Sequence, residues 1–514
     1  MKPTLLLFAG SITAFTQAQP GIQWQKSLGG SNYDEAYFLQ QCTDGGYVLA
    51  GRTRSINGDV AGNQGQDDFW VVRLDTAGQM LWQKPLGGSV NDGAVAIRQT
   101  TDGGYVVAGW TFSNSGQVSG NHGNADAWVV KLDFSGVIEW QKSFGGSMED
   151  AAYSVEQTSD GGYIIAGYAL SANGTVVGNH GGSDAWVIKL DASGTLQWQK
   201  PFGGSLDDKA YSVQQTSDGG FIFAGYTNSN NGDVDGNHGD FDYWVVKMDA
   251  SGNFEWQKTL GGLNEEYAYS IQQTTDGGYI VGGWSISNDG DVSGNHGNGD
   301  YWVVKLDSSS NILWQRALGG SMVDKAYTVR ETADAGFVVA GSSNSTDGDD
   351  TGNHGSDDYW MAKLDAAGAT VWEKSMGGTN SDIAWPMQPT SDGGYVVAGW
   401  SGSTNGDVSG NHGDRDIWVV KLASDVTEIG EQDGLGGLRL FPNPTPGRLT
   451  LQLDKPYGQF DIRVTDVTGR LVNTVPVGSG QTSTFDLGVG NGVYFVQVNA
   501  SPGSTGAVRV VVDK

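Results

Sequence analysis

The chain has 514 residues, 81 glycines and a net charge of −29. This length exceeds what one compact core usually accommodates, so we expect several units or a repeat array. The negative charge argues against nucleic acid and against an anionic membrane surface as partners, because both attract basic proteins. The single cysteine, Cys42, excludes a disulfide framework and stands where other copies of the repeat carry threonine.

Residues 1–18 have the features of a secretory signal peptide. Lys2 precedes a short apolar run, and small residues lead up to a cleavage site after Ala18. The apolar run is shorter than a transmembrane helix requires, and no other candidate span is evident. We therefore expect export to the periplasm and no membrane-spanning segment.

A 58-residue repeat fills residues 24 to about 423. It is marked by a recurring tryptophan in "WQK" or a near copy. The seven copies begin at Trp24, Trp82, Trp140, Trp198, Trp256, Trp314 and Trp372. Each copy contains four short runs rich in β-branched and aromatic residues, and turns such as "SDGG" separate them. No stretch has a sustained helical period.

Four antiparallel strands repeated seven times predict an all-β fold, a seven-bladed β-propeller. A parallel β-helix is the alternative, but its coils are usually shorter and its turns are not hairpins. The last copy lacks its fourth strand, and residues 22–26 supply a spare one. We therefore expect the N-terminal strand to complete the final blade over residues 19–423, which removes two exposed sheet edges.

The longest connection in each copy contains most of the conspicuous polar residues. All six histidines lie there in "NHG" motifs, one per copy, and Gln64 replaces histidine in the first copy. One histidine per blade is not a local zinc-ligand set, so we expect each to fix its loop through a hydrogen bond. This loop and the "LGGS" loop should share one end of the ring, which we call the long-loop face.

The same loops carry closely spaced oxygen donors that could bind calcium. They do not match the EF-hand pattern, because His238 stands at its glycine position and Trp244 at its final glutamate position. Two hypotheses stay open: plain Asx-type turns, or a different calcium loop in the fourth and fifth copies. The candidate calcium ligands are Asp233, Asn237, Asp242, Asp291, Asn295 and Asp300.

A ligand site formed by aromatic side chains is the next hypothesis. The residue after "AG" or "GG" in the third run leads into the long-loop face, and it is aromatic in five of the seven copies. Aromatic rings beside polar loops suit sugar rings, whereas contacts between blades are the structural alternative. The candidate ligand-binding residues are Arg52, Trp110, Tyr168, Tyr226, Trp284 and Trp400.

Enzyme activity is a weaker alternative. Acids recur at two positions of the repeat, but a glycosidase needs two carboxylates in unequal environments, and symmetry makes the recurring acids similar. No catalytic residues are predicted. Because one ligand site breaks the symmetry, the departures from the repeat also matter. They are Arg52, Arg54, Glu331, Trp385, Pro386 and Pro389.

The repeat ends near residue 423. An acidic, glycine-rich stretch over 424–437 reads as a linker. Residues 438–514 contain alternating strand patterns together with "FPNP" at 441–444, "VTDVTGRLV" at 464–472, "GVYFVQV" at 492–498 and a terminal run ending in Lys514.

These motifs resemble the C-terminal sorting domain of the Bacteroidetes type IX (Por) secretion system. The resemblance implies a small seven-stranded β-sandwich that is handled by the secretion translocon and its sorting peptidase. It also implies cargo that is released or attached to the outer cell surface. The residues that match the family's motifs are Pro442, Asn443, Pro444, Asp466, Gly469, Gly492, Tyr494 and Lys514.

The sequence therefore predicts a secreted or surface-displayed, monomeric propeller that acts as a binding or adhesion module, with polysaccharide as the candidate ligand. The repeats also resemble propeller-type repeats of secreted bacterial and archaeal proteins, which implies the fold and says little about activity. Two alternatives remain: an extracellular hydrolase or lyase with its site on the long-loop face, and a purely structural surface protein. No cofactor other than calcium is suggested.

Overall fold

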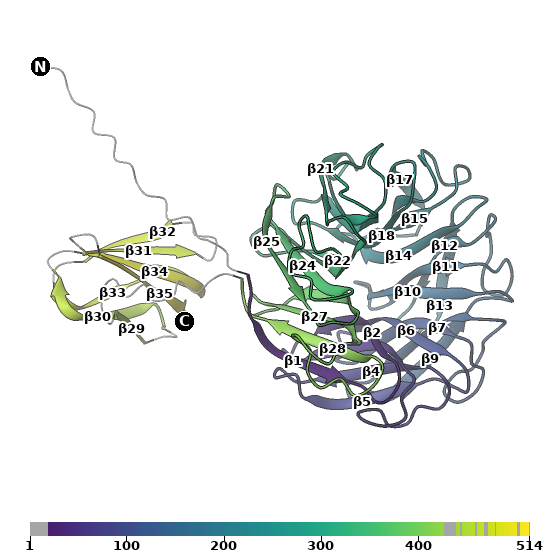
Figure 1. Ribbon diagram of the computed structural model, residues 1–514, viewed down its shortest axis with the longest axis horizontal. Coiled ribbons are helices and arrows are strands. Elements are labelled where there is room, and N and C mark those ends of the chain that lie inside the picture. The colour runs from purple at the N-terminus through teal and green to yellow at the C-terminus, as the bar shows by residue number, and fades with distance from the viewer. Residues whose placement is uncertain are drawn as a thin grey trace, which may run out of the picture. The chain divides into compact units, whose positions relative to one another are not determined.

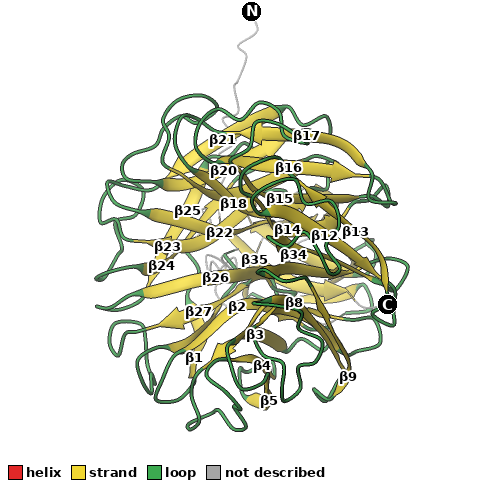
Figure 2. Cartoon of the chain, turned by 90° about the vertical axis from the view of Figure 1, so that its right-hand side faces the viewer, coloured by secondary structure: helices red, strands yellow, loops and turns green. Residues whose placement is uncertain are grey.

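The computed structural model describes residues 19–425, 438–442, 445–457, 460–466, 471–477, 480–500 and 504–512. Within these ranges the chain forms strands, turns and loops, and no helix is present (Figure 2). The contacts separate a compact unit, Gln19–Ser424, from the described residues that begin at Asp425. The predicted signal peptide (1–18) lies outside the described residues, as does most of the predicted linker (426–437).

Seven four-stranded antiparallel sheets form a ring over the first unit (Figure 1). The innermost strands are β2 (Asp34–Gln41), β6 (Asp92–Gln99), β10 (Asp150–Gln157), β14 (Asp208–Gln215), β18 (Glu266–Gln273), β22 (Asp324–Glu331) and β26 (Asp382–Pro389). The second strands are β3 (Tyr47–Thr53), β7 (Tyr105–Thr111), β11 (Tyr163–Ala169), β15 (Phe221–Thr227), β19 (Tyr279–Ser285), β23 (Phe337–Ser343) and β27 (Tyr395–Ser401). The third strands are β4 (Asp68–Leu74), β8 (Asp126–Leu132), β12 (Asp184–Leu190), β16 (Asp242–Met248), β20 (Asp300–Leu306), β24 (Asp358–Leu364) and β28 (Asp416–Leu422). The outer strands are β5 (Met80–Leu86), β9 (Ile138–Phe144), β13 (Leu196–Phe202), β17 (Phe254–Leu260), β21 (Ile312–Leu318), β25 (Thr370–Met376) and β1 (Ile22–Leu28).

The N-terminal strand closes the ring. β1 pairs antiparallel with β28, so that the seventh blade has the order β1-β28-β27-β26. The Nε1–H of Trp418 donates to Oε1 of Gln25 at 2.6 Å, the same bond that joins third and outer strands in other blades. The predicted propeller, with its last blade completed by the N-terminal strand, is confirmed.

The core lies between adjacent blades. Every residue of each third strand is buried, because both faces of that strand pack against neighbouring blades. One such cluster combines Ile164 and Val187 of the third blade with Phe223 and Trp244 of the fourth. Cys42 is also buried, just beyond the end of β2, and burial raises the pKa of its thiol to about 11.

A β-bulge in each innermost strand shapes the centre of the ring. In β14 the register shifts between Ala210 and Ser212, which leaves Tyr211 unpaired and aims it into the central channel. In the seventh blade the bulge spans both Trp385 and Pro386. A wider bulge accommodates proline there, because proline has no N–H to donate to the sheet.

The C-terminal unit contains seven strands in two sheets. One sheet has the order β29 (Arg439–Phe441), β30 (Arg448–Tyr457), β33 (Gly480–Asp486). The other has the order β32 (Leu471–Val477), β31 (Phe460–Asp466), β34 (Gly492–Ala500), β35 (Ser504–Val512). A core that includes Leu451, Ile462, Val496 and Val510 lies between the two sheets. The expected small β-sandwich is confirmed.

Candidate functional site

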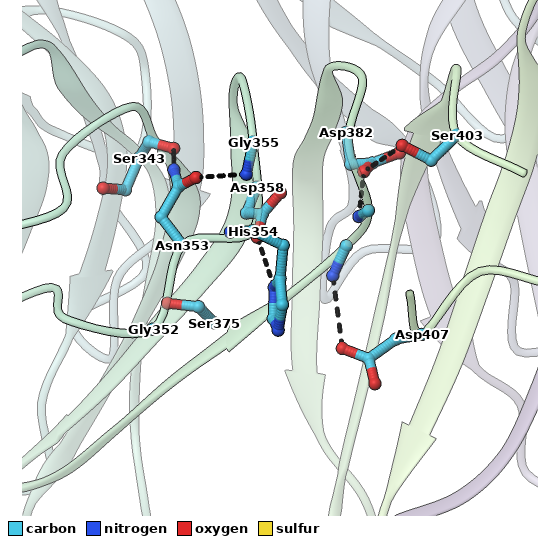
Figure 3. A network of polar contacts seen from close by, with 12 residues as sticks. Ser343, Gly352, Asn353, His354, Gly355, Asp358, Ser375, Asp382, Ser403 and Asp407 are labelled. Carbon is cyan, nitrogen blue, oxygen red and sulfur yellow. Dashed lines mark hydrogen bonds and ion pairs between the residues drawn. The ribbon is translucent and has the colours of Figure 1, made fainter. Parts of the chain in front are cut away.

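Each long loop is fixed by a histidine and an asparagine. In the sixth blade, Nδ1 of His354 lies 2.7 Å from Oδ2 of Asp358, and the backbone N–H of His354 donates to the same oxygen at 2.8 Å (Figure 3). Asn353 donates through Nδ2 to the carbonyl of Ser343, and its Oδ1 accepts from the N–H of Gly355, both at 2.8 Å. The expected hydrogen bond from the histidine is therefore present.

The same arrangement recurs around the ring. An Nδ1–Oδ2 distance of 2.6 Å joins the pairs His122–Asp126, His180–Asp184, His238–Asp242, His296–Asp300 and His412–Asp416. In the first blade the backbone N–H of Gln64 makes the equivalent bond to Asp68, at 2.8 Å. The histidines thus act one by one, each within its own loop.

The calcium candidates of the fourth blade already accept hydrogen bonds from the chain itself. Oδ2 of Asp233 accepts from the N–H of Gly203 at 3.2 Å, and Oδ1 of Asn237 accepts from the N–H of Gly239 at 2.9 Å. Oδ2 of Asp242 is the histidine-bound oxygen. These oxygens satisfy the loop backbone, as Asx-type turns do.

The fifth blade repeats these contacts. Asp291, Asn295 and Asp300 accept from backbone N–H groups at 3.4, 3.0 and 3.0 Å. Across the described ranges, no group of three or more His, Cys, Asp or Glu side chains is arranged to hold a metal ion. Calcium binding by these loops remains a prediction.

Pairs of buried acids join neighbouring blades on the long-loop face. The first acid, such as Asp208, accepts from the N–H of Gly204 at 2.7 Å and from the hydroxyl groups of Ser229 and Thr227. The second, such as Asp184, uses only its histidine-bound oxygen, and its buried Oδ1 has no hydrogen-bond partner. Burial, with a smaller contribution from the Asp208 charge, raises the pKa of Asp184 to about 6.

Several aromatic candidates contact the next blade rather than solvent. Tyr168 and Tyr226 are 9% and 7% exposed. Nζ of Lys209, from the fourth blade, lies 4.0 Å from the centroid of Tyr168. The ring of Tyr267, from the fifth blade, meets Tyr226 edge-on at 4.9 Å between centroids. Both tyrosines therefore contribute to packing between blades.

The next two candidates are half-buried. Nζ of Lys325 lies 4.4 Å from the centroid of Trp284, which also stacks on Tyr267 at 5.4 Å. Trp110 meets Phe112 edge-on, with their centroids 5.7 Å apart. The candidates from the second to the fifth blade are thus separate side chains around the rim, each with its own local partners.

Arg52 belongs to a charge network between the first and seventh blades. Its Nη2 lies 2.7 Å from Oε2 of the buried Glu35, and Nη1 of Arg415 lies 3.2 Å from Oε1 of the same residue. Burial opposes ionisation of Glu35, but Arg52, Arg415 and a hydrogen bond from Tyr37 hold its pKa below the ordinary value. This network fixes Arg415 on the long-loop face.

Trp400 borders a cavity of about 380 Å³ between the sixth and seventh blades. The Arg415 guanidinium lies 4.1 Å from the centroid of the Trp400 ring, so an apolar surface and a cation occupy the same wall. Asn380 is held by a 2.8 Å bond from its Nδ2 to the carbonyl of Gly402. The cavity is lined by Ser356, Thr379, Asn380, Ser381, Trp400, Gly402, Asp414 and Arg415.

Gly402 lines the cavity at a position where every other blade has a side chain. The equivalent positions carry Arg54, Phe112, Leu170, Asn228, Ile286 and Asn344. A Cβ at Gly402 would lie 3.3 Å from the carbonyl of Ser381 and 3.6 Å from that of Asp414, so a longer side chain would extend toward the cavity. Sequence reasoning found Trp400 but missed this glycine, although its departure from the repeat was a visible signal.

The described part of the sorting motif lies on strands or beside them. Gly492 begins β34, and Tyr494, two residues later, packs against the core of the C-terminal unit. Pro442 directly follows β29, and Asp466 ends β31. The remaining predicted motif residues, Asn443, Pro444, Gly469 and Lys514, lie outside the described residues.

The fold and the tail together define a secreted or surface-attached β-propeller protein. Residues 439–513 match the family model described as a secretion system C-terminal sorting domain, as their motifs indicated. This domain implies handling by the type IX secretion system. No helix among the described residues is long and apolar enough to span a membrane.

One curated relative matches part of the chain. The regulatory protein FlaEY of Caulobacter vibrioides is 25% identical over an alignment of 184 residues, and the match covers 32% of this chain and 19% of that protein. The chain therefore spans about a fifth of the length of this relative.

Solved structures with similar chain traces have low identity. Sqt1 from Chaetomium thermophilum is 11% identical, with 82% of this chain and 96% of that chain covered and a TM-score of 0.33. YCF48 bound to D1 peptide is 10% identical, with 82% and 92% covered and a TM-score of 0.34. The Synechocystis apocarotenoid oxygenase mutant Glu150Asp is 12% identical, with 72% and 97% covered and a TM-score of 0.33.

Proposed function

We propose that this protein is a secreted or surface-displayed carbohydrate-binding module, and that the cavity beside Trp400 and Gly402 holds the sugar. The observation that carries the proposal is the opening of a polar cavity of about 380 Å³ at the one blade where glycine replaces a longer side chain. Binding sites of this size usually combine an apolar wall with a few fixed polar groups.

The lining groups suit a polysaccharide chain end or branch. The Trp400 indole offers an apolar edge for sugar C–H groups, while Asn380, Ser381, Asp414 and Arg415 offer donors and acceptors for hydroxyl groups. The ion pair with Glu35 and the contact with Trp400 hold Arg415 in place before any ligand arrives. Such preorganisation lowers the entropic cost of binding.

The number of carboxylates in the cavity favours sugar binding over glycoside hydrolysis as its function. Asp414 is the only carboxylate among the lining residues. A glycosidase of the usual kind uses two carboxyl groups on either side of the scissile bond. The proposed role is therefore retention of a glycan at the cell surface or in the medium, after translocon and sorting peptidase have acted on residues 438–514.

The test compares glycan binding by the full chain with that of a cavity-filling variant. Gly402→Phe places in the seventh blade the residue that Phe112 provides in the second, and we expect at least tenfold weaker binding on a polysaccharide array and in calorimetry. Asn228→Phe makes the same change in the fourth blade and should bind normally. Absence of binding to every polysaccharide by the unaltered chain would favour the purely structural alternative, and equal binding by Gly402→Phe would place the site elsewhere.

A further inference from the structure

The central channel contains a second symmetry break that is independent of the Trp400 cavity. A cavity of about 100 Å³ lies in the channel and is lined by innermost strands of the blades. Its lining includes both an aromatic belt and two arginines, Arg98 and Arg330. The rest of this protein is strongly acidic, with a net charge of −29, so two cations in one narrow channel require an explanation.

The aromatic belt comes from the bulged position of the innermost strands. Successive centroids lie 4.9 Å apart for Tyr153 and Tyr211, 5.0 Å for Tyr211 and Tyr269, 5.2 Å for Tyr269 and Tyr327, and 4.1 Å for Tyr327 and Trp385. These rings constrict the channel with apolar faces. Water and small solutes that enter the cavity are therefore partly shielded from bulk solvent, which strengthens electrostatic interactions inside it.

Arg98 and Arg330 lie three residues after the bulged position of β6 and β22. The equivalent residues of the seven blades are Gln40, Arg98, Glu156, Gln214, Gln272, Arg330 and Gln388. The glutamines have a structural role: Oε1 of Gln272, for example, accepts the N–H of Glu331 in the next blade at 2.8 Å. The blade after Arg330 carries Pro389 at that position, which has no N–H, so glutamine is not required there.

The two guanidinium groups are incompletely neutralised. Nη2 of Arg98 lies 3.4 Å from Oε1 of Glu156, a long ion pair. Nη1 of Arg330 donates to Oγ of Ser270 at 2.8 Å and to the carbonyl of Val329 at 2.7 Å, and within residues 19–425 it forms no ion pair. Burial and the nearby Arg98 charge together lower the pKa of Arg330 to about 10.

We propose that the channel binds a small oxyanion, either a free inorganic anion or the carboxylate of a small organic molecule, through Arg330 and Arg98. Arginine presents several N–H donors in a planar fork that matches oxyanions, and most donors of Arg330 are unused. An anion there balances the second positive charge that Glu156 leaves uncompensated. An organic body attached to a carboxylate would contact the aromatic belt.

The experiment titrates the full chain by calorimetry in low-chloride buffer with three probes: sulfate, phosphate and benzoate. We expect binding of at least one probe. Tighter binding of benzoate indicates an organic carboxylate that uses the aromatic belt, whereas tighter binding of sulfate or phosphate indicates a free inorganic anion. No binding of any probe overturns the proposal.

Three variants test which groups act. Arg330→Gln introduces the residue found in four other blades, so it should fold, and we expect at least tenfold weaker binding. Glu156→Gln removes the competing carboxylate and should strengthen binding several-fold. Arg316→Gln, on an outer strand, is the control and should bind like the unaltered chain; equal binding by Arg330→Gln and Arg316→Gln would overturn the proposal.

Thermal unfolding provides a second readout that a structural role for Arg330 would not reproduce. Without an anion, Arg330→Gln should melt no lower than the unaltered chain, because it removes an uncompensated charge. With the bound probe at a hundred times its Kd, only the unaltered chain and the control should gain stability. Destabilisation of Arg330→Gln without anion, together with unchanged anion binding, would assign Arg330 a structural role instead.

Discussion

Asp184 of the third blade and Asp208 of the fourth bring carboxylate oxygens to the same side of Gly203. A Cβ on Gly203 would lie 3.0 Å from Oδ1 of Asp184 and 2.5 Å from Oδ2 of Asp208. Equivalent pairs occur at every junction between blades, with Glu266 as the variant member facing Asp242. Each of the seven junctions between blades thus places two buried acids beside the same glycine.

These pairs predict that the propeller is less stable at pH 8 than at pH 5. Burial raises the folded-state pKa of five acids to about 6, from an ordinary value of 3.8; they are Asp34, Asp68, Asp184, Asp300 and Asp358. Their stabilisation is complete below the unfolded-state pKa and is lost as pH rises through 6. We expect the melting temperature to fall by on the order of 5 °C between pH 5 and pH 8.

A matched pair of variants assigns this effect to the paired acids. Asp184→Asn removes one charge and supplies an N–H donor for Asp208, so it should reduce the pH dependence and raise stability at pH 8. Asp235→Asn changes an exposed acid of the long loops and should leave the profile unaltered. A profile that is flat in the unaltered chain would contradict the prediction.

Stability should also fall at much lower pH, for a different reason. Asp218 accepts from the buried Lys247, with Nζ 2.9 Å from Oδ2. Burial alone would raise the pKa of Asp218, but hydrogen bonds from Thr216 and Lys247 outweigh this effect and hold the pKa at about 2. Such a group stabilises the fold above its unfolded-state pKa, and this contribution is lost as pH falls from about 4 toward 2. Urea unfolding as a function of pH should therefore show a maximum near pH 4 to 5.

The histidine loops predict a graded response to substitution. His238→Gln reproduces the residue of the first blade. It keeps the backbone bond to Asp242 and offers an amide N–H in place of the ring nitrogen, so we expect a loss below about 1 kcal/mol. His238→Ala leaves Oδ2 of the buried Asp242 with one donor fewer and should cost about 1–3 kcal/mol. Chemical denaturation measures both, and an unchanged free energy of unfolding in His238→Ala would show that the ring nitrogen does not contribute.

The repeat determines most of what the sequence could predict. The tryptophan period and the four runs per copy predict the blades, and the missing last strand predicts ring closure through β1. The paired acids could not be predicted as pairs, because Asp184 and Asp208 meet only when two blades pack together. The Trp400 cavity also escaped prediction, because Asn380 comes from the β25–β26 connection, whereas Gly402 and Arg415 come from the two ends of the β27–β28 connection. These segments meet only in the folded ring.

Calcium removal should leave the melting temperature unchanged. Backbone N–H groups already donate to the side-chain oxygens of Asp233, Asn237 and Asp242. A calcium ion would have to displace these donors. Scanning calorimetry with excess chelator, and again with millimolar calcium, checks this. A fall on chelation that calcium reverses would support ion sites in these loops, and Asp233→Asn should then abolish part of the response.

The closing strand predicts that the N-terminal residues matter more to the propeller than the entire C-terminal unit. Removal of residues 19–28 deletes β1, exposes the edge of β28 and leaves Trp418 without its bond to Gln25. We expect a loss above about 4 kcal/mol and aggregation through the exposed edge. Removal of residues 426–514 should leave the melting temperature of the propeller within about 1 °C, because the compact ring ends at Ser424.

A peptide spanning residues 19–28 should restore the shortened ring in trans, because it can add to β28 as an antiparallel strand. Recovery should require both the backbone pairing and the side chains that face the ring. A peptide with Trp24→Ala and Gln25→Ala loses the edge contact with Tyr47, at 5.6 Å between centroids, and the bond to Trp418. If the shortened chain melts like the full one, or if both peptides restore it equally, β1 does not close the ring in the way that its register indicates.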